Sequence, residues 1–373
     1  MNFLSRFDIS NEAAEKRCME IFHTIFYGAE GERVYTPVGD TLGYIEDTGN
    51  HDVRTEGMSY GMMMCVQMDR KDEFDRLWNW VKTYMYISEG PNKGFFAWSC
   101  QTDGKKNSLG AAPDGEEYFI MSLIFAGNRW GNGDGIFNYH KEAGELLHTC
   151  INKGYDGTPG RAMFDRETAY IRFICEVDYT DPSYHLPHFY ELYTQVAVDE
   201  ADAEFCKRAA RESREYWKKA CHPETGLSAE YAKYNGKPQK VNKKWFGGRH
   251  DWFYSDAYRT ILNIAVDSVW FGTTDWAKEE ADRYISFFER PENQDDWDHI
   301  YEVDGRKLKE NALHPVAIIA TNATTAVLVD NEKTAKWVKR FLDTPLRLGD
   351  RRYYDNCLYF FSYMILSGNY KIW

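Results

Sequence analysis

Three acidic residues that lie far apart in the sequence each stand at the predicted start of a helix, beside small or aromatic residues. They are Glu56 in Thr-Glu-Gly-Met-Ser-Tyr, Asp114 in Ala-Pro-Asp-Gly-Glu, and Asp256 in Tyr-Ser-Asp-Ala-Tyr. Two carboxyl groups on opposite sides of a cleft can hydrolyse a glycosidic bond, because one protonates the leaving oxygen while the other activates water. These residues are therefore candidates for acid–base chemistry on a sugar.

Each of the three also has a purely structural explanation. A carboxylate at a helix N-terminus complements the helix dipole, Asp114 with Glu117 resembles a capping box, and Asp256 with Arg259 can form an ion pair across one turn. The catalytic interpretation depends on their electrostatics. Apolar neighbours raise the pKa of a general acid such as Glu56, whereas Arg259 keeps Asp256 ionised and able to accept a proton from water.

Helical periodicity supplies the elements that must position these residues. Apolar spacing predicts helices through 58–66, 120–127 and 258–265, directly after the acidic residues. Further helices are predicted over 11–27, 73–87, 136–151, 184–196, 199–219, 273–289, 315–327, 331–342 and 355–366. Strand signals are limited to two short hairpins in loops, at Phe95–Ser99 and Tyr231–Trp245. About twelve helices without a linker favour one all-α domain over residues 1–373, either a helical toroid or a solenoid.

The composition narrows the classes of partner. The chain of 373 residues has a formal net charge of −13, which argues against nucleic acid or a membrane surface, because both require a basic face. Aromatic residues make up 16% of the chain, enough to fill a core and also line a groove. Such rings pack on the flat C–H faces of sugars, so the composition is compatible with a carbohydrate cleft.

The sequence predicts neither membrane insertion nor a cofactor. Met1–Glu12 lacks the features of a secretory signal, and no stretch of about 18 apolar residues predicts a membrane span. The eight cysteines are scattered without a CxxC pair, so we expect reduced thiols in a cytoplasmic protein and no zinc site. Gly131–Gly135 lacks the spacing of a calcium loop, and no metal or organic cofactor is expected.

Taken together, these segments resemble glycoside hydrolase family 8 over nearly the whole chain. The most specific part is Ala112-Pro113-Asp114-Gly115-Glu116, continued by Phe119, Ser122, Leu123, Ile124, Ala126 and Trp130. It is similar to the family signature, in which an acidic loop leads into a helix that ends with Trp. Pro113, Glu116 and Ile120 depart from the usual Ser or Thr, Asp and Ala at those positions, but Asp114 is in place.

The resemblance implies an (α/α)6 barrel and an inverting mechanism, with the two catalytic carboxyl groups about 6.5–9.5 Å apart. Glu56 matches the family's general acid, and Asp256 matches the general base, with Arg259 beside it. Asp114 matches the residue that holds the distorted sugar at the cleavage point. Tyr184, in Asp-Pro-Ser-Tyr-His, is similar to the tyrosine that helps hold the attacking water.

Further sugar contacts follow from the same resemblance. Trp98 and Trp252 resemble residues that stack on sugar rings, and Arg54, beside the acid motif, is expected to bind substrate. Tyr353 and Tyr354 begin the last predicted helix and are expected to reach the cleft, although a role in the core explains them equally well.

The segment Leu313-His314-Pro315 bears on specificity. It resembles the loop that closes one end of the cleft in family members that release xylose from the reducing end of xylo-oligosaccharides. We therefore expect exo-acting hydrolysis of β-1,4 bonds, with His314 reading the last xylose. The alternatives are an endo-acting xylanase, glucanase or chitosanase of the same family, a sugar epimerase on the same type of barrel, and a non-catalytic sugar-binding protein. The sequence leaves the oligomeric state open.

Overall fold

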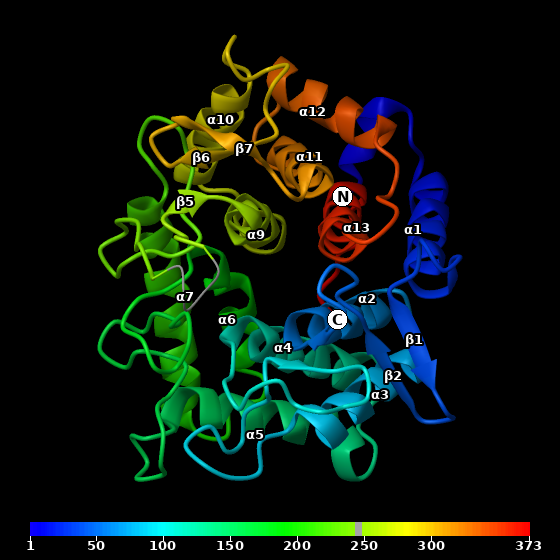
Figure 1. The fold of residues 1–373 in the computed structure, drawn as a ribbon, viewed down its shortest axis with the longest axis vertical. Coiled ribbons are helices and arrows are strands. Elements are labelled where there is room, and N and C mark those ends of the chain that lie inside the picture. The colour runs from blue at the N-terminus through cyan, green and yellow to red at the C-terminus, as the bar shows by residue number, and fades with distance from the viewer. Residues whose placement is uncertain (243–247) are drawn as a thin grey trace.

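A computed structural model describes residues 1–242 and 248–373, and within these ranges it contains six inner and six outer α-helices. Figure 1 shows them as two concentric rings. The inner helices are α2 (Thr55–Gln67), α4 (Pro113–Trp130), α6 (Pro187–Tyr193), α9 (Tyr258–Phe271), α11 (Pro315–Ala323) and α13 (Arg352–Ser367). The outer helices are α1 (Asn11–Tyr27), α3 (Lys71–Trp80), α5 (Tyr139–Asn152), α7 (Glu200–Ala220), α10 (Asp275–Phe288) and α12 (Glu332–Asp343).

The inner ring is closed. Each inner helix contacts the next one in chain order, and α13 contacts α2. Each outer helix packs against one inner helix, with α1 against α13. This arrangement is the (α/α)6 barrel, so the predicted all-α class and the toroid are confirmed, and the solenoid is excluded.

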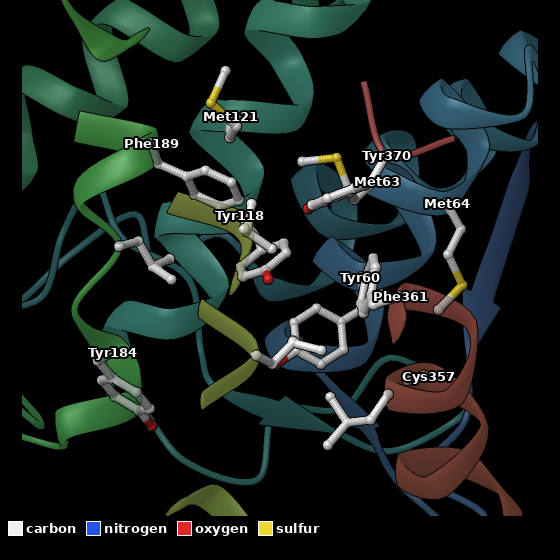
Figure 2. Packing of buried hydrophobic residues seen from close by; sticks show 14 of the residues in the cluster. Tyr60, Met63, Met64, Tyr118, Met121, Tyr184, Phe189, Cys357, Phe361 and Tyr370 are labelled. Atoms are coloured by element: carbon white, nitrogen blue, oxygen red, sulfur yellow. The ribbon is translucent and has the colours of Figure 1, made fainter. Parts of the chain in front are cut away.

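The two rings differ in their burial pattern. Inner helix α4 is buried from Pro113 to Gly127, without a solvent-facing side. Outer helix α12 buries Trp337, Val338 and Phe341 and exposes its charged face, as an amphipathic surface helix does. Figure 2 shows the middle of the barrel filled with side chains, among them Tyr60, Tyr118 and Phe361. The barrel centre is therefore a packed core, with ring centroids 4.8 Å apart for Tyr60 and Tyr118.

The connections are long at one end of the barrel and short at the other. Residues 68–70 join α2 to α3 and residues 272–274 join α9 to α10, whereas residues 28–54 lead into α2 and residues 221–257 lead into α9. The short helices are η1 (Phe3–Phe7), η2 (Val81–Met85), η3 (Gly135–Phe137), η4 (Pro182–Tyr184), η5 (Ser255–Ala257) and η6 (Thr324–Val327). The long segments contain all of the strands and the short helices η2, η4 and η5, whereas η1 precedes α1 and η3 and η6 lie in short connections.

The strands form small antiparallel sheets in these loops. Strand β1 (Tyr35–Val38) pairs with β2 (Leu42–Ile45), β3 (Val53–Arg54) pairs with β4 (Ser99–Cys100), and β5 (Trp252–Phe253) pairs with β6 (His299–Glu302), which pairs with β7 (Lys307–Asn311). The first predicted hairpin, Phe95–Ser99 followed by the turn Thr102–Gly104, is confirmed only at its end, where Cys100 forms an antiparallel bridge with Lys106 across that turn. The part before Ser99 pairs elsewhere, since Phe96 forms a bridge with Tyr86, and β4 also pairs with β3. The second predicted hairpin has a bridge between Ala232 and Pro238, and its end at Trp245 lies outside the described residues.

Two predicted helices differ from the observed ones at their starts. The helix predicted at 184–196 begins at Pro187, because η4 and residues 185–186 precede it, and this places Tyr184 in a tight turn. The helix predicted at 136–151 is divided into η3 and α5.

Among the described helices, none is long and apolar enough to cross a membrane.

Candidate active site

A cleft of about 830 Å³ opens at the barrel end where the long loops lie. Its volume is within the range of about 300–1,000 Å³ that small-molecule sites occupy. Of the residues singled out in the sequence, those that line it are Arg54, Glu56, Trp98, Asp114, Tyr184, Asp256, Leu313, His314, Tyr353 and Tyr354. Arg259 and Trp252 are not among the lining residues.

Residues in the first turns of the six inner helices, or just before those helices begin, line the cleft. Glu56 and Asp114 are in the first turns of α2 and α4, and His314 is the N-cap of α11. Tyr184 and Asp256 lie in η4 and η5, which lead into α6 and α9, while Tyr353 and Tyr354 begin α13. The N-terminal ends of these helices therefore lie at the cleft end of the barrel, where their unpaired N–H groups and dipoles favour negative charge.

Arg259 joins the three predicted acidic residues from beneath the cleft. Its Nη1 lies 2.7 Å from Glu56 Oε2 and 3.5 Å from Asp114 Oδ2, while its Nη2 lies 3.0 Å from Asp256 Oδ1. The side chain is only 4% exposed. The guanidinium thus separates Glu56 from Asp256, and each of these carboxyl groups binds a different nitrogen.

Glu56 has the surroundings of a general acid. Burial raises its pKa to about 7; Arg259 opposes this shift, and the neighbouring charges of Asp114 and Asp256 add to it. Its other oxygen, Oε1, accepts a hydrogen bond of 2.8 Å from the Tyr353 hydroxyl. A carboxyl group with this pKa still holds a proton near neutral pH and can donate it.

Asp114 sits deeper in the same cluster. Burial raises its pKa to about 6, against the opposing effect of Arg259. The capping box suggested for Asp114 and Glu117 is wrong, because Pro113 occupies the first helical position and Ala112 is the N-cap. Glu117 is instead buried and accepts a hydrogen bond from the Tyr190 hydroxyl.

Asp256 is the most exposed of the three carboxyl groups, at 26% of its side chain. It follows Ser255, whose φ of +33° is a strained conformation for a residue with a side chain. The Ser255 carbonyl accepts a hydrogen bond of 2.9 Å from Tyr354. Tyr354 therefore fixes the turn that directs Asp256 into the cleft, in contact with both water and Arg259.

The predicted aromatic contacts differ in position. Trp98 is 37% exposed in the cleft, and the guanidinium of Arg54 lies 5.4 Å from its ring centroid. Asp47 and Asp52 in turn bind Arg54, at 3.1 and 2.9 Å. Trp252 is half-buried and is not among the lining residues; it donates its indole N–H to Glu230 Oε2 at 2.6 Å.

His314 occupies one side of the cleft, next to Leu313. Its Nδ1 lies 3.2 Å from Asp355 Oδ2, and its ring meets the ring of Tyr354 edge to face at 4.9 Å. The buried Asp355 also accepts a 2.7 Å hydrogen bond from the backbone of Ala317. A histidine that donates through Nδ1 in this way presents Nε2 as an acceptor.

Two acidic side chains at the site, Glu230 and Asp181, were not predicted from the sequence, and the position of Tyr353 was left open between cleft and core. Glu230 lines the cleft and accepts hydrogen bonds from His250 and Trp252, and burial raises its pKa to about 7. No motif marked it, because it lies in a loop. Asp181 is fully buried near Arg259; the Asp-Pro pair, a turn signal, could have identified it. Tyr353 lines the cleft rather than only the core.

Comparison with known proteins adds independent information. The profile of "Glycosyl hydrolases family 8" matches residues 1–366. The chain is 51% identical to a reducing end xylose-releasing exo-oligoxylanase of Halalkalibacterium halodurans, over 100% of this chain and 94% of the relative. It is 48% identical to Rex8A of Paenibacillus barcinonensis, a reducing-end xylose-releasing exo-oligoxylanase, over 100% and 96%. A structure of Rex8A complexed with xylose superimposes with a TM-score of 0.94, covering 100% of this chain and 97% of that one.

Proposed function

Because this chain belongs to glycoside hydrolase family 8, we propose that it releases xylose from the reducing end of xylo-oligosaccharides by hydrolysing β-1,4 bonds. The single observation that carries the proposal is the cluster of carboxyl groups around Arg259 at the base of the cleft. It is supported by the match to xylose-releasing relatives over the whole of this chain. The protein is accordingly an enzyme, with xylo-oligosaccharides as its substrates.

The proposed chemistry uses two carboxyl groups in different protonation states. Water held between Asp256 and Tyr184 attacks the anomeric carbon and gives its proton to Asp256. The bond to the leaving oxygen breaks as Glu56 donates its proton to that oxygen. Attack from the face opposite the leaving group inverts the anomeric configuration.

Arg259 keeps the two roles distinct. Its Nη2 binds Asp256, which is 26% exposed and open to water. The Glu56 side chain is more enclosed, at 15% exposure, and burial raises the pKa of its carboxyl group to about 7. Pairs of carboxyl groups whose environments push their pKa values apart are the usual basis for dividing acid and base roles. We propose that Asp114, which shares Nη1 of Arg259 with Glu56, binds the sugar at the cleavage point.

The exo specificity rests on the side of the cleft formed by Leu313 and His314. We propose that Nε2 of His314 accepts a hydrogen bond from the terminal xylose, since Asp355 holds Nδ1. Trp98 and Arg54 supply stacking and polar contacts on another wall. An endo-acting hydrolase would instead need a cleft that continues past His314.

We also propose a reducing compartment, the cytoplasm, for this protein. Its eight cysteines are all free and buried, and burial raises the thiol pKa of Cys18 and Cys100 to about 11. Buried thiols with raised pKa values are inert and are typical of proteins kept reduced. Fractionation of the source cells, with activity assayed in each fraction, tests this part of the proposal.

The function is tested by product analysis on xylotriose and on xylotriitol, its chemically reduced form. Wild-type protein is expected to yield xylose and xylobiose from xylotriose and nothing from xylotriitol. Asp256→Asn is the control and is expected to yield neither product. Equal cleavage of both substrates would support the endo-acting alternative, while no cleavage of either would leave a sugar-binding protein.

A further inference from the structure

Asp181 is a fully buried carboxyl group beneath the cleft that the proposed mechanism does not use. It is the N-cap of η4, the turn that carries Tyr184. Its Oδ1 accepts a hydrogen bond of 2.7 Å from the backbone N–H of Ser183. Its backbone carbonyl accepts a hydrogen bond of 3.0 Å from the N–H of Tyr184. Both hydrogen bonds set the direction in which Tyr184 leaves the turn.

The rest of the η4 turn is anchored from two other elements. The indole of Trp217, on α7, donates to the Pro182 carbonyl at 3.1 Å, and the amide of Asn263, on α9, donates to the Ser183 carbonyl at 2.7 Å. The Tyr184 ring then lies 5.5 Å from the Arg259 guanidinium and lines the cleft. Because the other anchors hold carbonyl groups, Asp181 is the side chain that holds the N–H side of the turn.

The second oxygen of Asp181 indicates that the carboxyl group is uncharged. Oδ2 makes no hydrogen bond within the described residues. Its nearest cation is Nη2 of Arg259, at 3.8 Å, and that nitrogen lies closer to Asp256, at 3.0 Å. One guanidinium cannot neutralise four carboxylates, and burying an unpaired charge is very costly. In agreement, burial and then the charge of Asp256 raise the pKa of Asp181 well above its usual value.

We propose that Asp181 is a positioning residue of the hydrolysis: as an uncharged acid it caps the η4 turn and thereby holds Tyr184 at the attacking water. This inference rests on the proposed function for the role of Tyr184. It assigns to Asp181 a geometric role rather than a proton transfer. The neutral amide of asparagine should therefore replace it, whereas alanine should not.

The test is a double-mutant cycle on xylotriose with Asp181→Ala, Asp181→Asn and Tyr184→Phe. Asp181→Ala is expected to lower kcat by about 10–100-fold with little change in KM, because small misplacements of catalytic groups cost that much. Asp181→Asn keeps the cap and is expected to retain kcat and the pH profile of the wild type. In the Tyr184→Phe background, Asp181→Ala is expected to cost much less than it does alone, since both changes remove the same contact.

Asp199→Ala is the matched control, because Asp199 caps α7 through a 2.9 Å hydrogen bond from the Asp202 N–H, away from the cleft. It is expected to lower the melting temperature and leave kcat unchanged. Additive losses from Asp181→Ala and Tyr184→Phe, or an equal loss of kcat in Asp181→Asn and Asp181→Ala, would overturn the proposal.

A crystal structure of Asp181→Ala gives a readout that does not depend on turnover. The proposal expects the Tyr184 ring to move away from Arg259, and an unmoved ring overturns it even if another substrate proves correct. Failure of the proposed function is a separate outcome, because it would appear in the wild-type assay on xylotriose.

Discussion

At the residue scale, the site depends on the sharing of one guanidinium among several carboxyl groups. Glu56 and Asp256 bind different nitrogens of Arg259, at 2.7 and 3.0 Å, and differ in their access to water. The enclosed Glu56 retains its proton, while the open Asp256 meets solvent. The proposed division of roles between acid and base therefore follows from burial and not from residue type, since both side chains are carboxylic acids.

Replacing Glu56 by glutamine should separate the two roles. Glu56→Gln removes the proton donor, and kcat on xylotriose is expected to fall by about 10²–10⁴-fold. The loss should be much smaller on β-xylobiosyl fluoride, because fluoride leaves without needing a proton. Asp256→Asn serves as the comparison, since loss of the base should impair both substrates. Equal losses of Glu56→Gln on both substrates would contradict its role as the acid.

The pH dependence follows from the same residue. Because the pKa of Glu56 is raised to about 7, the acid is protonated below that pH and ionised above it. We expect kcat/KM on xylotriose to fall about tenfold per pH unit above about pH 7. The measurement is kcat/KM across a series of buffers at constant ionic strength. A rate that stays flat to about pH 9 would rule out Glu56 as the proton donor.

At the element scale, the inner helices share one design: each begins at the cleft. Proline at the first helical position of α4, α6 and α11 fixes where these helices start. The side chains just before or after each start then point at a common centre. Long loops precede every inner helix except α13, which follows the short segment 344–351. Loops often carry binding residues, and Trp98 and Glu230 reach the cleft from these loops.

Close packing of α2 and α4 should be essential for the site. A Cβ added at Gly115 would lie 2.4 Å from Cβ of Thr55, which precedes Glu56, and 3.1 Å from the Thr55 backbone. Gly115→Ala is therefore expected to push the two helix starts apart, at a cost of about 1–3 kcal/mol of stability, and to lower kcat. Unfolding by denaturant and turnover of xylotriose measure the two effects.

Gly31→Ala is the matched control for that change. A Cβ at Gly31 meets nothing within 4 Å, so stability and kcat are expected to stay at wild-type values. A Gly115→Ala variant that behaves like Gly31→Ala would show that the approach of α2 to α4 does not position Glu56.

At the scale of the whole molecule, the closed inner ring surrounds an aromatic core directly beneath a cluster of acids. Tyr60 of that core also accepts a 3.0 Å hydrogen bond from Arg259, and its ring meets Phe361 at 5.2 Å. The core thus excludes water from the underside of the cleft and sustains the raised pKa values. We propose that residues 1–373 form a single domain, because α1 and α13 from opposite ends of the chain pack together.

The buried acids should make the folded state less stable as the pH rises. Burial raises the pKa values of Glu56, Asp114, Glu116, Glu230 and Glu280 to about 7, 6, 8, 7 and 7. In the unfolded chain the same groups lose their protons near pH 4. At pH values between the unfolded and the folded pKa values, the folded state binds more protons than the unfolded chain. The free energy of unfolding is therefore expected to fall from about pH 5 to about pH 8.

Denaturant unfolding across that pH range measures this effect, and a single domain is expected to give one transition. Glu280→Gln is a useful comparison, because Glu280 lies on α10, outside the cleft, and its removal should flatten the decline without affecting turnover. An unfolding free energy that rises over this range would contradict the assignment of protons to these buried acids.

Much of the site could be predicted from the sequence, because its residues sit at helix starts with recognisable local signals. Glu56, Asp114 and Asp256 were identified in this way, and Arg259 through its spacing from Asp256. The orientation of Trp252 could not be predicted, since it depends on the hydrogen bond to Glu230, which is distant in sequence. Glu230 itself lies in a loop whose path is set by tertiary contacts. Short strands such as β6 and β7 were missed for the same reason.

The central claim is that Glu56 and Asp256 hydrolyse a β-xylosidic bond with inversion. Proton NMR during hydrolysis of xylotriose tests it most directly, because the anomeric signals of the new reducing end can be recorded before mutarotation brings the α and β anomers to equilibrium. Our account predicts that this new end forms first in the α configuration, together with free xylose. A new end that forms first in the β configuration would contradict the account and would require Asp256 or another carboxylate to act as a nucleophile.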